Sequence, residues 1–204
     1  MRPLSDLFPL IVPRTPGAPE PLIRRECALA ARLLCSELRC WSEWLEPVRA
    51  LQPGTEYDME APVGATIILV EGATIGGKDG RLASWRTYRT DPAGSVPGDA
   101  LVPVSHVAFR VGDDVAPGAE IRLRAVLEPT IEATALPDHV MDLYGQAIAD
   151  GAMASLMLMP GQPFSNPQLA GAHAGAFHAA ITGAHTREWR SRTNVTPRVR
   201  PTWC

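Results

Sequence analysis

The chain has 204 residues, of which 46% are hydrophobic and 20% are charged, and its formal net charge at pH 7 is −3. A chain of this length can bury one substantial core, so we expect one main domain. This hydrophobic content excludes an intrinsically disordered protein, while 17 glycines and 20 prolines predict many turns and prominent loops.

The longest apolar runs, residues 65–70 and 152–159, are far shorter than the roughly 20 residues that a membrane-spanning helix needs. We therefore expect no transmembrane helix and no membrane partner. Prolines and Asp6 interrupt the first residues, where a signal peptide would carry an unbroken apolar segment. We expect the protein to stay in the cytoplasm until it is assembled.

Residues 1–21 contain six prolines, which predict an extended N-terminal arm that ends at the start of a helix. An amphipathic helix is predicted from Leu22 to about Trp44, because apolar residues recur there every three or four positions. This stripe consists of Ile23, Cys27, Ala30, Leu34, Leu38, Trp41 and Leu45.

Residues 52–130 alternate short apolar runs with glycine- and proline-rich turns, which predicts a β-rich insertion. The predicted strands are residues 66–70, 82–90, 101–111 and 119–127. The last is the clearest, since Ile121, Leu123 and Ala125 alternate with arginines. We expect a small antiparallel sheet or sandwich.

Two further helices are predicted after the insertion. Asp138 follows a proline and begins a helix whose apolar side continues to Met159. Pro160 and Gly161 end that helix, and Asn166-Pro167 begins the next, which runs toward Trp189. Alanine and glycine are frequent over residues 145–184, which fits both a tightly packed helical pair and a crowded interface between subunits.

Together these elements predict an α+β protein. Its helical domain comprises residues 22–51 and 131–189 and is interrupted by the β-rich insertion of residues 52–130. Extended arms are predicted at residues 1–21 and 190–204.

The C-terminal end is strongly basic. Residues 187–204 hold five arginines and one glutamate, a net charge of +4, so the other 186 residues carry −3 − 4 = −7. The tail is either solvated or a docking arm. Docking is favoured because the apolar residues Val195, Val199 and Trp203 are spaced four apart. The predicted docking residues are Arg190, Arg192, Val195, Arg198, Val199, Arg200 and Trp203.

No motif predicts an active site, a cofactor or a metal. Residues 72–79 place an aspartate where a phosphate-binding loop needs Ser or Thr, and their context favours a hairpin. The histidines lack the spacing of a helical zinc pair. Asp113-Asp114 reads as a turn, and Asp138 with Asp142 reads as the acidic first turn of a helix.

Cysteines 27, 35 and 40 fall on the first predicted helix and Cys204 is the last residue of the sequence. Because Cys27 and Cys35 are about 12 Å apart on a straight helix, we expect buried thiols rather than a disulfide or a metal site. Cys204 is placed where oxidation between subunits is feasible.

The motif Met159-Pro160-Gly161-Gln162-Pro163-Phe164-Ser165-Asn166-Pro167-Gln168-Leu169-Ala170, with its flanking helices, resembles the C-terminal helical pair of head-to-tail adaptor (connector) proteins of tailed bacteriophages. The opening is also similar to that family, from Pro16 through Ala30-Ala31 and Cys35 to Trp41 and Trp44. The resemblance covers the two ends of the chain and not the β-rich middle.

This resemblance implies a structural virion protein of the head-to-tail neck and not an enzyme. About 12 copies would form a ring between the portal ring and the next neck or tail protein, around packaged DNA that is contacted non-specifically. The C-terminal arm would dock on the portal. The residues expected in the helical core or subunit interface are Trp41, Trp44, Tyr144, Met159, Phe164 and Leu169. The alternatives are another neck component, such as a head-completion or tail-terminator protein, and a small enzyme with an unrecognised site.

Overall fold

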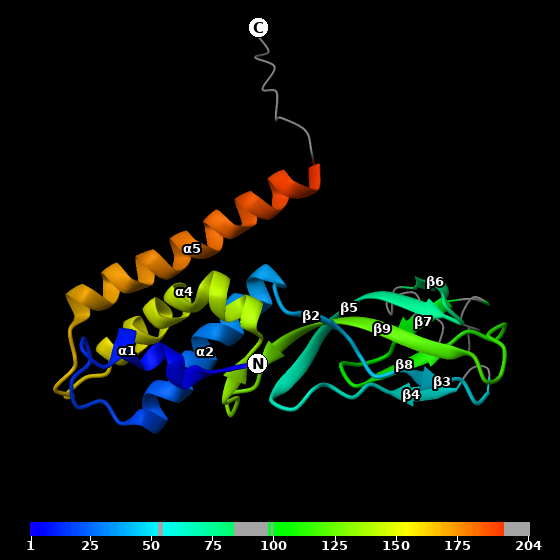
Figure 1. Cartoon of the computed structure of the whole chain (residues 1–204), viewed down its shortest axis with the longest axis horizontal. Helices are drawn as coiled ribbons and strands as arrows, with labels where there is room; N and C mark the ends of the chain where they lie inside the picture. Colours follow the sequence, from blue (N-terminus) through cyan, green and yellow to red (C-terminus); the bar gives the residue numbers. More distant parts are fainter. Residues whose placement is uncertain (53–54, 84–97, 99, 194–204) are drawn as a thin grey trace, which may run out of the picture.

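The computed structural model describes residues 1–52, 55–83, 98 and 100–193. Helices gather at one end of the molecule and strands at the other, and β9 (Glu120–Pro129) runs from the strand-rich end toward the helices (Figure 1). The strand-rich part lies in the sequence between α2 (Glu20–Leu38) and α4 (Asp138–Met157). The chain is therefore an α+β protein, as predicted.

Residues 1–21 are folded against the helices, so the predicted extended arm is wrong. Strand β1 (Arg2–Pro3) is followed by a 3-10 helix, η1 (Leu4–Leu7), and by α1 (Phe8–Ile11). Leu4, Leu7 and Ile11 are buried, because their spacing of three and four residues places them on one helical face. The prolines at 3 and 9 lie at helix starts, where the missing N–H is tolerated.

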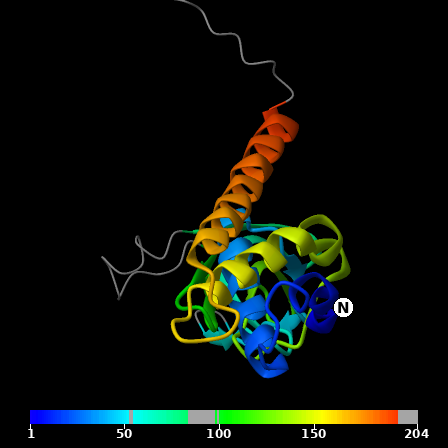
Figure 2. The ribbon, with the colours of Figure 1, turned by 90° about the vertical axis from the view of Figure 1, so that its left-hand side faces the viewer.

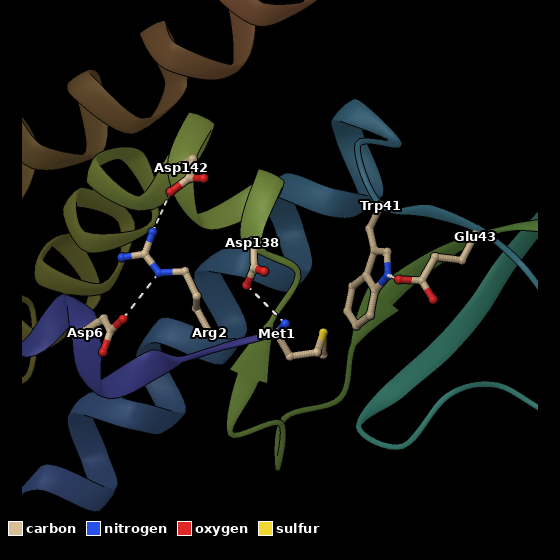
Figure 3. A network of polar contacts seen from close by, with 7 residues as sticks. All are labelled: Met1, Arg2, Asp6, Trp41, Glu43, Asp138 and Asp142. Atoms are coloured by element: carbon tan, nitrogen blue, oxygen red, sulfur yellow. Dashed lines mark hydrogen bonds and ion pairs between the residues drawn. The ribbon is translucent and has the colours of Figure 1, made fainter.

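Ion pairs tie this N-terminal segment to the start of α4 (Figure 3). The amino group of Met1 lies 3.0 Å from Asp138, and Arg2 contacts both Asp6, at 3.3 Å, and Asp142. All these groups are substantially exposed, so each pair contributes no more than about 1 kcal/mol. Asp138 in the first turn of α4 and Asp142 one turn later are each matched with a cation.

Helix α2 ends at Leu38, earlier than predicted. Arg39 takes the left-handed conformation (φ 50°), and its N–H donates to the carbonyl of Cys35 at 2.8 Å, which closes the helix. The chain then enters β2 (Ser42–Trp44), so Trp44 lies in a strand and not on the helix. Trp41 lies in the connection and is fully buried, and its Nε1 donates to Glu43 at 2.8 Å (Figure 3).

Besides β2 and β9, the main sheet contains β3 (Val48–Arg49), β4 (Glu56–Asp58), β5 (Ala65–Ile75), β6 (Lys78–Leu82), β7 (Ala100–Pro103) and β8 (Ala108–Val111). The strand order is β2–β9–β5–β6–β7–β8–β4, and β3 also pairs with β9. A separate small pair joins β1 to β10 (Ala135–Leu136). The strand-rich part therefore begins at Ser42 rather than at residue 52.

Two predictions in the sheet are confirmed. Along the first half of β9, buried Ile121 and Leu123 alternate with exposed arginines; from Ala125 to Pro129 every residue is buried, because that half also contacts α2. Residues 72–79 form part of the β5–β6 hairpin, whose turn residues Gly76 and Gly77 both have positive φ.

Two other predictions are corrected. The single strand expected at 101–111 is two antiparallel strands, β7 and β8, because the chain reverses between Pro103 and Ala108. The sheet is mixed and not purely antiparallel, since β6 and β7 pair in parallel. A parallel pair needs a connection of about a dozen residues or more, and residues 83–99 provide that length. Most of the strand expected at 82–90 lies outside the described residues.

The predicted C-terminal helical pair is present, with shifted ends. Helix α4 ends at Met157 rather than Met159, and α5 (Pro167–Thr193) continues past Trp189. As predicted, Asn166 caps α5, where its side-chain oxygen accepts from the N–H of Leu169 at 3.2 Å. Of the helices in the described part of the chain, none has the length and hydrophobicity that a membrane crossing requires.

Candidate interaction surface

Helix α5 lies on α4 and α2 through one narrow stripe. Its buried residues are Ala170, Phe177, Ile181 and Ala184, which recur at helical spacing. The helix is about 40 Å long at 1.5 Å per residue, and its C-terminal part stands out from the body (Figure 2). Most of the helix surface is therefore not used by the fold of this chain.

The stripe packs closely where α4 crosses beneath it. A Cβ placed on Gly151 of α4 would lie 2.9 Å from the Cβ of Ala30 in α2 and 3.1 Å from the ring of Phe177 in α5. Such distances are too short for a side chain, so a glycine is needed where the three helices meet. This glycine serves the packing of the chain itself.

Polar contacts add to the packing between the helices. His173 of α5 lies 2.8 Å from Asp150 of α4, with both side chains largely buried. Ser155 of α4 donates to the buried Glu26 of α2 at 2.6 Å. A buried carboxylate that loses its donor is costly, so these contacts favour one arrangement of the helices.

The opposite face of α5 is different in character. Gly171, Gly175, Ala179 and Gly183 follow one another every four residues, and all are exposed. A Cβ on any of these three glycines would meet nothing within 4 Å. Moreover, residues 167–186 contain no Asp, Glu, Lys or Arg. An exposed helix face without charged side chains is unusual in a soluble protein and is a candidate contact surface.

The residues predicted for the helical core or subunit interface do not form one group. Trp41 and Phe164 are buried and Met159 and Tyr144 are half-buried, so these four belong to the chain's own fold. Trp44 and Leu169 are each 49% exposed but lie far apart in the fold, on β2 and on the first turn of α5. Only Leu169 belongs to the helix with the uncharged face.

The predicted docking arm is divided by the structure. Arg190 and Arg192 lie within α5, which extends to Thr193, so the arm does not begin at residue 190 as predicted. The other predicted docking residues, Val195, Arg198, Val199, Arg200 and Trp203, lie outside the described residues. The basic segment is therefore partly the end of a projecting helix.

Reasoning from sequence missed the uncharged face of α5. The signal was available, since the gap in charged residues from 167 to 186 can be read directly. The alanine–glycine bias of residues 145–184 is compatible with a packed helical pair and with a subunit interface, and it does not separate α5 from α4, which has a similar composition and buries its small residues.

The strand-rich end contains a groove of about 700 Å³ lined by β5, β6 and the β7–β8 turn. Its lining is mainly apolar, from Ile67 to Val70 and Pro103, and its polar side chains are those of Ser105 and His106, which are exposed. Within the described residues, no group of three or more His, Cys, Asp or Glu side chains is arranged to hold a metal ion. A scan of protein-family models gives no match to this chain, and a search of curated proteins also gives none.

Proposed function

We propose that this chain is a structural subunit of a phage neck ring, the adaptor that joins the portal ring to the next neck or tail protein. The observation that carries the proposal is the long uncharged face of α5, which is exposed in the single chain. A neighbouring subunit packed on that face would remove it from water. The resemblance of residues 159–170 to phage adaptors supports the same assignment.

The chemistry of this face suits packing between copies. Glycine at an exposed position inside a helix costs about 1 kcal/mol relative to alanine. No close contact inside the chain requires glycine at these three positions, because a Cβ there would meet nothing within 4 Å. Small side chains let a second backbone approach closely. In a ring of more than two copies this face would pack on a different surface of the next copy, and such heterologous contacts close into rings when the rotation allows.

The charge distribution of the chain supports a contact between its C-terminal segment and the portal ring. Arg187, Arg190 and Arg192 lie in the C-terminal part of α5, and Arg198 and Arg200 follow it in the sequence. The rest of the chain carries a net negative charge. Arginines with interspersed apolar residues are suited to docking on a partner with acidic groups and apolar pockets. We assign this segment to the contact with the portal, and non-specific contact with packaged DNA is its less favoured alternative.

The proposal is tested with the purified portal ring of the same phage. The full chain and a variant ending at Thr193, which keeps α5 intact, are each mixed with the portal, and bound mass is measured by sedimentation and native mass spectrometry. Stoichiometric binding by the full chain alone is expected. Binding by both would move the docking contact into the helical domain. Binding by neither would contradict the adaptor role and favour another neck position.

A paired substitution tests the α5 face separately. Gly175→Leu adds a side chain to the uncharged face, whereas Glu56→Leu adds one at an exposed position on β4. Neither variant should lower the unfolding free energy of the parent by more than about 0.5 kcal/mol. Only Gly175→Leu should reduce the number of copies per portal. Equal incorporation of the two variants would remove α5 from the interface between copies.

A further inference from the structure

Cys35 and Cys40 lie with their sulfur atoms 3.8 Å apart. On a continuous helix, residues five apart point about 140° away from each other, at 3.6 residues per turn. Here the helix ends between the two cysteines, so the spacing no longer separates them. In the longer helix that the sequence predicts, which extends to Trp44, the two cysteine side chains would point in different directions.

The end of α2 explains the approach of the two sulfurs. Arg39 adopts the left-handed conformation, and its N–H donates to the carbonyl of Cys35, so Cys35 is the last-turn residue on which the cap closes. In caps of this kind the side chain of that residue commonly contacts a side chain just beyond the left-handed residue. That contact is usually between two hydrophobic side chains, and here it is between two thiols.

The two thiols differ in access. Cys35 is fully buried and Cys40 is half-buried. The hydrogen bond with Cys40, burial, and the charges of Cys40 and Glu128 all raise the pKa of Cys35. A reagent in solution must therefore meet Cys40 first. Cys27, on the same helix, is fully buried, and burial followed by the charge of Glu26 raises its pKa to about 12.

We propose that Cys35 and Cys40 are a dithiol modification site, which a small-molecule disulfide such as oxidised glutathione converts to an intramolecular disulfide. The thiolate of Cys40 attacks one glutathione sulfur, forms a mixed disulfide and releases one glutathione thiolate. Cys35 then loses its proton and attacks the sulfur of Cys40, which releases the second glutathione. The protein loses two electrons and two protons, and oxidised glutathione gains them as two thiols.

The geometry requires little movement for this bond. The sulfurs must come closer by about 1.8 Å to reach a disulfide length near 2.05 Å. The bond would fasten the end of α2 to the residue before Trp41. The carbonyl of Trp41 accepts from the N–H of Leu127 in β9 at 2.8 Å, so the bond would reinforce the junction between the helices and the sheet.

The test uses the full chain with Cys204→Ser, which leaves three cysteines. The folded protein is incubated with oxidised glutathione, quenched with acid, unfolded, alkylated without reduction and weighed by mass spectrometry. We expect one alkyl group instead of three and no retained glutathione. Digestion with trypsin, which cleaves after Arg39, should then yield residues 33–39 joined to residues 40–49. Three alkyl groups, or glutathione retained on Cys40, would overturn the proposal.

Single variants in the same background separate the roles of the three cysteines. Cys35→Ser should stop at the mixed disulfide and keep one glutathione on Cys40, and Cys40→Ser should keep both remaining thiols. Cys27→Ser is the matched control and should still form the joined peptides. Loss of the joined peptides in Cys27→Ser, or a glutathione adduct on Cys35 in Cys40→Ser, would contradict the assignment.

Discussion

Helices α4 and α5 are both rich in alanine and glycine, yet the fold uses them in opposite ways. In α4 most apolar and small residues are buried, and a side chain on Gly151 would collide with α2 and α5. In α5 a single stripe is buried, and side chains on Gly171, Gly175 and Gly183 would meet nothing. Small residues serve intramolecular packing in α4, and they remain unused by the chain in α5. The candidate interface is therefore the exposed face of α5.

The largest expected effect comes from removing the anchor between the two helices. Phe177→Ala should lower the unfolding free energy by about 3–5 kcal/mol, because a nearly buried aromatic side chain is lost and leaves a cavity. Urea unfolding followed by circular dichroism measures this change. Leu169→Ala, at an exposed position on the same helix, should change it by less than about 0.5 kcal/mol. Similar losses in the two variants would mean that α5 has no defined buried stripe.

The contrast between the glycines can be tested by the same substitution in each helix. Gly151→Leu should lower the unfolding free energy by about 1–3 kcal/mol or more, because the side chain would overlap Ala30 and Phe177. Gly175→Leu should leave it unchanged or slightly higher. Denaturant unfolding measures the unfolding free energy of both variants. If Gly151→Leu were as stable as Gly175→Leu, the close approach of the three helices would be wrong.

Loss of the hydrogen bond between Ser155 of α4 and Glu26 of α2 should lower the unfolding free energy by less than loss of the packing contacts. Ser155→Ala removes the donor to the buried Glu26, which should lower the unfolding free energy by about 1–2 kcal/mol. Ser36→Ala, at an exposed position on α2, is the control and should change it by less than about 0.5 kcal/mol. Alanine favours a helix more than serine does, so helix propensity cannot cause a loss in either variant. A loss of equal size in both variants would therefore show that the contact with Glu26 makes no specific contribution.

Local signals in the sequence predicted part of this fold well. The prolines and Asn166 between α4 and α5, the alternation in β9 and the paired glycines of the β5–β6 turn each act within a few residues. The short strands β2 and β3 were missed because their partner, β9, lies about 75 residues later in the sequence and creates the strands by pairing. The prolines of residues 1–21 outweighed the stripe of Leu4, Leu7 and Ile11.

The candidate surface was less predictable, for a physical reason. The sequence shows that residues 145–184 are rich in small side chains, but Gly151 and Gly175 have the same local context of alanines and a few bulky apolar residues. Whether a glycine is covered depends on which helix crosses it, and this is a property of the tertiary fold. The absence of charged residues from 167 to 186 favours α5 over α4 as the helix with the contact surface, since a helix surrounded by solvent normally carries charged residues.

The smallest effect gives the most direct test of the exposed α5 face. Gly175→Ala should raise the unfolding free energy of the isolated chain by about 0.5–1 kcal/mol, because alanine favours the helix and its Cβ meets nothing within 4 Å. Thermal unfolding at low protein concentration measures this gain. The same substitution in the assembled ring should give a smaller gain or a loss, since a neighbouring helix close to Gly175 has no room for the methyl group. An equal gain in chain and ring would show that no neighbour packs on this face.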